Sequence, residues 1–137
     1  MGGVRVTQGA YLFDTHALIF WANKTSVSAE FIKFFDHQAQ QGALHVSSIT
    51  FWEIALLVQK GRLAIPDIHA WKNELLSQTN IQLINPSATE MIDSTLLPPH
   101  HKDPFDRLLL AQAKHNNLIL VTRDQLMLTY TVPQIWM

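Results

Sequence analysis

The chain has 137 residues, of which 47% are hydrophobic and 15% are charged, and this size and composition are typical of one compact domain. A formal net charge of −1 excludes binding to nucleic acid through overall charge, so any such binding must rest on local clusters of Lys and Arg. The lack of cysteine excludes disulfides, thiolate metal sites and cysteine nucleophiles.

The chain starts with MGGVRVTQGA, which has no long apolar segment of the kind found in a signal peptide. No later apolar segment approaches the about 20 residues needed to span a bilayer. We therefore expect a cytoplasmic protein that is not inserted in a membrane. We also expect one domain over residues 1–137, in which residues 1–9 form a flexible extension.

Short apolar segments typical of buried strands then alternate with longer segments of helical periodicity. This alternation predicts an α/β fold with a parallel sheet that is covered on both faces. The expected strands are 10–13, 44–46, 81–84, 118–121 and 134–136. The expected helices are 17–22, 28–41, 50–60, 67–79, 87–96 and 104–116, with a short helical piece after residue 124.

Asp14 and Glu53 are the first two acids next to expected strand ends. Asp14 closes the first strand, and Glu53 lies in the first turn of the helix after the second strand. Each has an ordinary structural interpretation, because Asp14 can cap a helix and Thr50-x-x-Glu53 has the spacing of a capping box. Ligands of parallel sheets, however, bind outside the carboxyl ends of the strands. Both residues are therefore also candidates for a site.

Two further acids lie at the starts of later helices. Asp103 has the position of an N-cap, and Asp106 lies in the first turn of the same expected helix. Asp124 follows the fourth strand and could also be an N-cap. Capping explains each residue locally, and for Asp103 we prefer it to a role as a ligand.

The four acids together indicate more than each does alone, because the predicted fold brings them to one edge of one sheet and capping does not predict this convergence. Carboxylates held a few ångströms apart repel one another unless they are protonated or neutralised, and a hard divalent cation is their usual neutraliser. Oxygen ligands without cysteine favour Mg²⁺ or Mn²⁺ over structural zinc. Such an ion can activate water for attack on a phosphodiester. The catalytic and metal-binding candidates are Asp14, Glu53, Asp106 and Asp124.

Four segments of the chain resemble the PIN domain family, and within it the VapC-like toxins of bacterial type II toxin–antitoxin pairs. The segments are FDTHALIFW at 13–21, SSITFWEIALLVQKGRL at 47–63, HHKDPFDRLLLAQA at 100–113 and LVTRD at 120–124. The resemblance extends from about residue 11 to residue 136 and keeps the order and approximate spacing of the four acids.

The resemblance implies a three-layer α/β/α sandwich with a central parallel β-sheet and an Mg²⁺- or Mn²⁺-dependent endoribonuclease activity. It implies that the acids at positions 14, 53, 106 and 124 bind the metal. It also implies a homodimer and inhibition by a cognate antitoxin whose tail enters or covers the active-site groove.

Two features depart from the family's usual pattern, namely the extension at residues 1–9 and the small number of basic residues near the acidic motifs. Five scattered cations are few for an RNA-binding surface. We expect them to contact RNA or the antitoxin, although the arginines could instead form ion pairs with the acids. These residues are Lys60, Arg62, Lys102, Arg107 and Arg123.

Hydroxyl and imidazole groups near the acids are further candidates for a role at the metal site. Thr15 and Thr122 could orient a carboxylate or a metal-bound water, although capping and strand propensity explain them equally well. His16, His100 and His101 could be metal ligands or proton donors. For His100 and His101 we favour exposed loop positions, because adjacent histidines in a proline-rich loop rarely face one ion.

Apolar residues near the motifs have simpler interpretations. We expect one apolar side of the helix at 104–116 to pack on the sheet. We interpret Trp52 and Trp71 as core or dimer contacts rather than as platforms for base stacking. The residues expected on the buried side of the helix are Phe105, Leu108, Leu109 and Ala111.

Three other functions share part of this pattern with a nuclease. A phosphatase of the haloacid-dehalogenase type needs a second acid two residues after Asp14, where this chain has His16. A receiver-type signalling domain needs an Asp after the third strand, where this chain has Asn85 and Pro86. A non-catalytic PIN-like module that binds RNA or protein remains as the alternative. Metal binding would discriminate this module from the enzyme.

Overall fold

The computed structural model describes residues 9–137 and confirms the expected α/β fold. Of the predicted extension at residues 1–9, only Gly9 lies within the described residues. The strands are β1 (Tyr11–Phe13), β2 (Leu44–Ser47), β3 (Gln82–Ile84), β4 (Ile119–Val121) and β5 (Gln134–Ile135). The helices are α1 (Thr15–Asn23), α2 (Ala29–Gln40), α3 (Ser48–Gln59), α4 (Ile68–Gln78), α5 (Ala88–Leu96) and α6 (Pro104–His115), with the short 3₁₀ helix η1 (Met127–Thr129).

The five strands form one parallel sheet in the order β3-β2-β1-β4-β5, with β1 at its centre. The chain therefore builds β1, β2 and β3 outward in one direction and then returns to place β4 on the other side of β1. In open sheets of this kind, the point where the strand order reverses is the place where ligands bind. Here that point lies between the carboxyl ends of β1 and β4.

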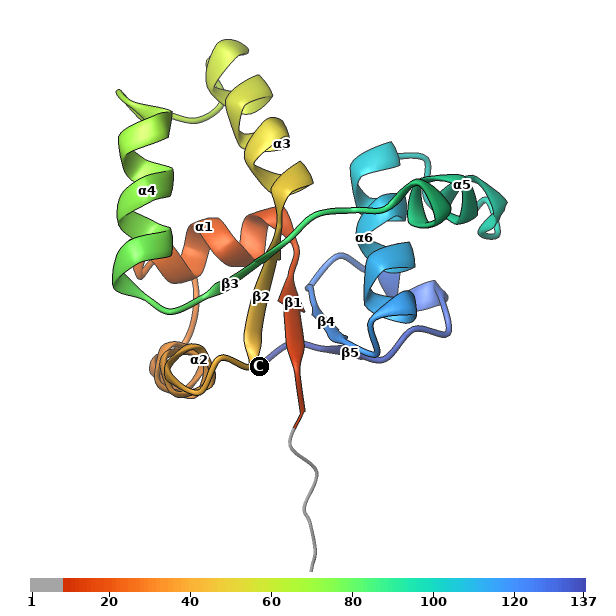
Figure 1. Cartoon of the computed structure of the whole chain (residues 1–137), viewed down its shortest axis with the longest axis horizontal. Coiled ribbons are helices and arrows are strands. Elements are labelled where there is room, and N and C mark those ends of the chain that lie inside the picture. The colour runs from red at the N-terminus through yellow and green to blue at the C-terminus, as the bar shows by residue number, and fades with distance from the viewer. Residues whose placement is uncertain (1–8) are drawn as a thin grey trace, which may run out of the picture.

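Helices cover both faces of the sheet (Figure 1). α1, α2 and α4 pack on the face that carries Phe13, whereas α6 and η1 pack on the face that carries Leu12. α5 packs against α6. Because successive residues of a strand point to opposite faces, β1 contributes to both cores. The three-layer α/β/α sandwich is confirmed.

The end of β1 is held rigidly by aromatic packing. Phe13 is fully buried, and its ring lies 5.1 Å from that of Phe35 and 5.5 Å from that of Trp21, measured between centroids. Buried aromatic contacts of this kind stabilise a core by more than their area alone predicts. Since Asp14 follows Phe13 directly, this packing limits the movement of its backbone.

Two local expectations need correction. The segment at 81–84 forms a strand, as predicted, but β3 is an edge strand whose Gln82 and Leu83 side chains are exposed, and it is not buried. α3 begins earlier than expected, because Ser47 is its N-cap and accepts a hydrogen bond from the Ile49 amide. Thr50 therefore lies inside the helix, and its interpretation as the start of a capping box is wrong.

The helices of the described part of the chain are short or polar. None of those within residues 9–137 is long and apolar enough to cross a membrane.

Candidate metal centre

An open pocket of about 470 Å³ lies at the carboxyl edge of the sheet, where β1 and β4 end. The two strand ends are joined by a hydrogen bond of 3.1 Å from the Asp14 amide to the Val121 carbonyl. This bond brings the residues that follow the two strands close together. The pocket is lined by Asp14, His16, Glu53, His101, Asp103, Asp106, Arg123 and Asp124.

Asp14 has two roles, as the N-cap of α1 and as the most buried acid of the pocket. Its Oδ1 accepts a hydrogen bond of 2.8 Å from the Ala17 amide, and the residue is only 6% exposed. Burial raises the pKa of Asp14 above its usual value, and the negative charge of Asp124 adds to this shift, while the Thr122 side chain and the Ala17 amide oppose it. The capping interpretation is confirmed, and the second carboxylate oxygen is not needed for the cap.

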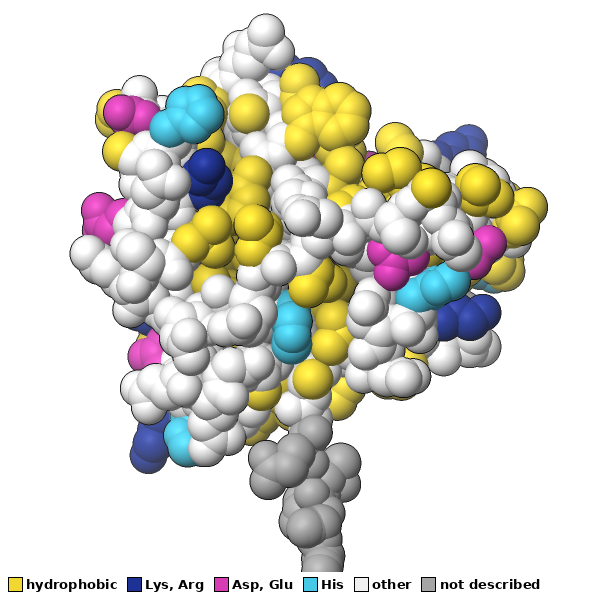
Figure 2. Space-filling view, viewed as in Figure 1, with side chains coloured by type: hydrophobic (Ala, Val, Ile, Leu, Met, Phe, Trp, Pro, Cys, Tyr) yellow, Lys and Arg dark blue, Asp and Glu magenta, His cyan; other side chains and the backbone are white. Residues whose placement is uncertain are grey.

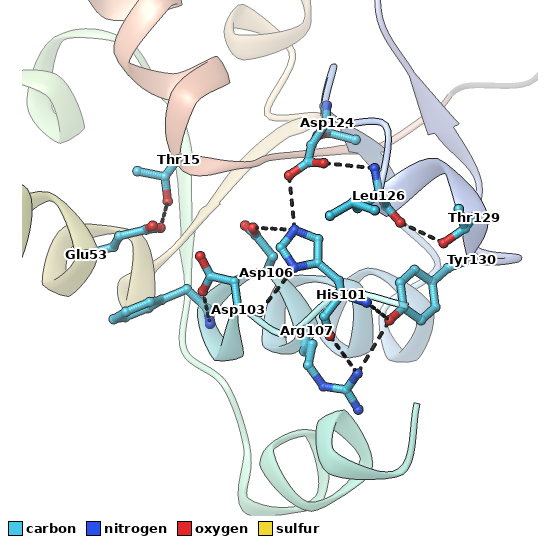
Figure 3. Close-up of polar contacts among 12 residues, drawn as sticks. Thr15, Glu53, His101, Asp103, Asp106, Arg107, Asp124, Leu126, Thr129 and Tyr130 are labelled. Carbon is cyan, nitrogen blue, oxygen red and sulfur yellow. Dashed lines mark hydrogen bonds and ion pairs between the residues drawn. The ribbon is translucent and has the colours of Figure 1, made fainter. Parts of the chain in front are cut away.

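Glu53 belongs to α3 and is oriented by a hydroxyl from α1. The Thr15 hydroxyl donates a hydrogen bond of 2.5 Å to Glu53 Oε1, and Thr15 is itself buried (Figure 3). Burial raises the pKa of Glu53, and the charges of Asp103 and Asp14 raise it further. The Glu53 side chain is therefore directed toward the pocket and does not return to cap its own helix.

Asp106 lies in the first turn of α6 and faces the other carboxylates. Burial raises its pKa to about 8, and the charges of Asp103, Glu53, Asp14 and Asp124 contribute to the shift. Asp103 is the N-cap of α6, as predicted, and accepts a hydrogen bond of 2.9 Å from the Phe105 amide. It is also a fifth carboxylate in the pocket lining, which the sequence did not predict.

Asp124 lies on the turn after β4, where two backbone hydrogen bonds define its position. Its amide donates to the Thr122 hydroxyl at 3.0 Å, and its Oδ1 accepts from the Leu126 amide at 2.9 Å. Burial by itself would raise the pKa of Asp124, but hydrogen bonds from His101 and from the Leu126 amide outweigh it and lower the pKa. Of the four acids predicted to bind the metal, Asp124 is therefore the one whose pKa is lowered and not raised.

His101 connects two of the acids, and its expected position in an exposed loop is wrong. The residue is buried, and its Nε2 lies 3.0 Å from Oδ2 of Asp106 and 3.0 Å from Oδ2 of Asp124 (Figure 3). Its Nδ1 accepts a hydrogen bond of 3.1 Å from the Asp103 amide. The local sequence contains no signal for this burial, because the contact that draws the loop inward comes from Tyr130.

Tyr130 and Arg107 fasten the loop that carries His101. The Tyr130 hydroxyl accepts from the His101 amide at 2.9 Å and donates to the Pro98 carbonyl at 2.6 Å. The Arg107 guanidinium donates to the carbonyls of Leu97, Pro98 and His101 at 2.8, 3.0 and 3.0 Å. Arg107 thus holds this loop in place, and its expected contact with RNA or antitoxin stays a prediction.

Among the remaining four basic candidates, Arg123 lines the acidic pocket. Its guanidinium carbon lies 4.5 Å from the ring centroid of Phe20 and 5.6 Å from that of Trp136. Stacking of this kind uses the faces of the guanidinium and leaves its in-plane N–H donors available for a phosphate or carboxylate. Three other cations are exposed and lie outside the pocket lining, namely Lys60, Arg62 and Lys102.

The other histidines and the two tryptophans are also located. His16 is exposed at the pocket rim. His100 is exposed with its ring 5.2 Å from that of Tyr130, so the surface interpretation holds for His100. Trp71 packs against the core, as expected. Trp52 is 59% exposed and contacts Phe105 with a ring separation of 5.2 Å.

The donor set of the pocket fits a hard divalent cation. Ligand atoms of His101, Asp106 and Asp124 lie within 4.8 Å of one another, and the mutual repulsion of the carboxylates contributes to the raised pKa of Asp106. A cation of charge +2 would remove that repulsion, and carboxylate oxygens are the ligands that Mg²⁺ and Mn²⁺ prefer. The acids that would hold it are Asp14, Glu53, Asp106 and Asp124, which come from four separate segments of the chain.

The sequence of this chain matches the model of the PIN domain family over residues 11–130. The chain belongs to the PIN domain family. Its predicted resemblance to that family is confirmed, and the matched region contains all four acids predicted to bind the metal.

Individual relatives of this PIN domain are similar to it over nearly their whole length. Ribonuclease VapC22 of Mycobacterium tuberculosis is 30% identical over 128 residues, which cover 90% of this chain and 93% of the relative. The crystal structure of VapBC2 from Rickettsia felis bound to a promoter DNA fragment aligns with a TM-score of 0.69 at 17% identity, covering 93% of this chain and 98% of the matched chain. A toxin–antitoxin complex from Klebsiella pneumoniae aligns with a TM-score of 0.59 at 22% identity, covering 92% and 96%.

Proposed function

We propose that this PIN domain is an endoribonuclease that depends on Mg²⁺ or Mn²⁺ and is the toxin of a toxin–antitoxin pair. The observation that carries the proposal is the convergence of Asp14, Glu53, Asp106 and Asp124 on one pocket. Local backbone hydrogen bonds explain Asp14 and Asp124, but they do not explain why Glu53 is oriented by a hydroxyl of another helix or why Asp106 faces four other acids. The similarity to a ribonuclease supports RNA as the substrate.

In this proposal the acids of the pocket bind the ion, and the ion supports hydrolysis of the phosphodiester. Asp14, Asp106 and Asp124 would hold the ion, with Glu53 directed to it by the Thr15 hydroxyl. When bound, the ion supplies a water of lowered pKa and neutralises charge on the phosphate oxygens. No side chain of the pocket is required as a nucleophile.

Arg123 is our candidate for the contact with the RNA backbone nearest the acids. Its stacking on Phe20 and Trp136 fixes the guanidinium at the pocket, and a planar guanidinium pairs well with phosphate oxygens. Lys60, Arg62 and Lys102 are exposed and stay predictions as more distant contacts with RNA or antitoxin.

The proposed function includes a cognate antitoxin and a homodimer of this chain in the cytoplasm. Complexes of toxin with antitoxin among the similar structures support the antitoxin partner. Exposed apolar side chains on α5 support a protein interface, and Figure 2 shows hydrophobic side chains gathered over that helix. These side chains are Met91, Ile92 and Leu96, which are 48%, 61% and 75% exposed.

The test is cleavage of a mixed panel of fluorogenic single-stranded RNAs in Mg²⁺, in Mn²⁺ or in EDTA. Asp14→Asn is the active-site variant, because the amide oxygen of Asn can keep the hydrogen bond from Ala17 while the ligand charge is lost. Glu74→Gln is the matched control, since it removes one charge from an exposed position on α4. Both variants are purified in the same way, so that contaminating nuclease affects them equally.

We expect the wild type and Glu74→Gln to cleave RNA in metal and not in EDTA, and we expect Asp14→Asn not to cleave. Water attack assisted by metal should leave a linear phosphate on one product and a hydroxyl on the other, whereas attack by the ribose 2′-hydroxyl would leave a 2′,3′-cyclic phosphate. Equal activity of the wild type and Asp14→Asn in every metal would contradict the proposal and favour a non-catalytic module.

A further inference from the structure

The imidazole of His101 contacts the carboxylates of two acids of the pocket at once and is not itself an acid. Its Nε2 lies 3.0 Å from an oxygen of Asp106 and 3.0 Å from an oxygen of Asp124. These acids come from α6 and from the turn after β4, which are separate in sequence. The proposed function does not assign a role to this bridge.

Hydrogen bonding determines which ring nitrogen carries the proton. The Asp103 amide can only donate, and it donates to Nδ1 of His101 at 3.1 Å. Nδ1 must therefore present a lone pair, so the ring proton is on Nε2. A protonated Nε2 has no lone pair in the ring plane, so it donates to carboxylates and does not bind a cation.

The backbone around His101 is fixed independently of any ligand. Its amide donates to the Tyr130 hydroxyl at 2.9 Å, and its carbonyl accepts from Arg107 at 3.0 Å. The imidazole is therefore held from the backbone side and from Nδ1, and the two carboxylates are held by it (Figure 3).

We propose that His101 is a positioning residue of the metal centre and not one of its ligands: its Nε2–H holds the Asp106 and Asp124 carboxylates in the arrangement that binds the ion. Hydrogen bonds to ligating carboxylates limit their rotation, and loss of such a partner weakens metal affinity by about 10–100-fold. This inference rests on the proposed metal site and adds a residue to it that is neither an acid nor a capping group.

The first experiment measures Mn²⁺ affinity by electron paramagnetic resonance, without RNA, for the wild type and three variants. His101→Leu removes the donor, His101→Gln keeps an N–H at the end of the side chain, and His100→Gln is the matched control at the exposed neighbour. We expect His101→Leu to bind Mn²⁺ at least 10-fold more weakly, His101→Gln to recover part of the loss, and His100→Gln to equal the wild type. Equal affinity of His101→Leu and the wild type would overturn the proposal, as would equal losses in the Leu and Gln variants.

Two spectroscopic measurements on the wild type keep the proposal testable even if His101→Leu does not fold. Long-range ¹H–¹⁵N correlation spectra of the metal-free protein should show His101 with its proton on Nε2, and a proton on Nδ1 would overturn the proposal. Electron spin echo spectra of bound Mn²⁺ should lack the strong nitrogen coupling of a directly bound imidazole, and its presence would make His101 a ligand. A wild type that binds no Mn²⁺ would refute the proposed metal site as well, whereas normal binding with unchanged variants refutes the positioning role alone.

Discussion

Replacing Asp106 with Asn should make the free energy of unfolding of the metal-free protein depend less on pH. The pKa of Asp106 is raised from 3.8 to about 8, by burial first and then by the surrounding acids. The folded state therefore retains a proton that the unfolded state releases near pH 4. The stability associated with this proton is fully present below the unfolded pKa and is lost as the pH rises through the folded pKa.

The size of the effect follows from the shift. Each pKa unit corresponds to about 1.4 kcal/mol, so raising the pH from 5 to 8 should lower the free energy of unfolding by on the order of 3 kcal/mol through Asp106. Burial and repulsion also raise the pKa values of Asp14 and Glu53. The free energy of unfolding of the wild type should therefore fall by at least this amount. The lowered pKa of Asp124 contributes little over this range, because that residue is ionised in both states throughout.

The assay is urea unfolding in EDTA at pH 5 and at pH 8, followed by circular dichroism. Asp106→Asn should lose on the order of 3 kcal/mol less than the wild type between the two pH values, because its amide does not titrate. Glu74→Gln removes an exposed charge on α4 and should follow the wild type. If the free energy of unfolding falls equally in Asp106→Asn and the wild type, the charged form of Asp106 is not disfavoured by burial and by its neighbours. The electrostatic account of the pocket would then be wrong.

Three further predictions concern the same pocket. Asp14→Asn keeps the acceptor for the Ala17 amide and removes a buried charge, so its melting temperature without metal should equal or exceed that of the wild type; a clear fall would contradict this. Thr15→Val removes the hydroxyl that orients Glu53 with little change of volume, and Mn²⁺ affinity should fall by about 10-fold or more; an unchanged affinity would refute the role of Thr15. Saturating Mg²⁺ at about 100 times its Kd should add about 2.7 kcal/mol to the free energy of unfolding, and an equal gain in Asp106→Asn would locate the ion elsewhere.

The fold was predictable from the sequence because its signals are local. Short apolar strands and amphipathic helices alternate, and the structure contains each of them within a few residues of the expected bounds. The edge position of β3 was not predictable, because the segment at 81–84 is as apolar as a central strand and the strand order depends on contacts between distant segments. Helix α3 was placed late because Ser47 and Thr50 are both acceptable N-caps, and the sequence alone does not choose between them.

The site was predictable where an acid follows a strand or begins a helix, and not where it depends on contacts across the fold. Asp14 and Asp124 were placed by the parallel sheet itself. The burial of His101 depends on the Tyr130 hydroxyl, which lies 29 residues away, and the pairing of Thr15 with Glu53 joins residues 38 positions apart. Contacts between residues so far apart in the chain are not predicted by any local sequence pattern.

The most direct test of the central claim is a crystal of the protein soaked in Mn²⁺ and measured at the manganese absorption edge. The account predicts an anomalous peak among the carboxylates of Asp14, Asp106 and Asp124, and no such peak in crystals of Asp106→Asn. A peak at another place, or full occupancy in the variant, would contradict the claim that this acidic pocket is the metal centre.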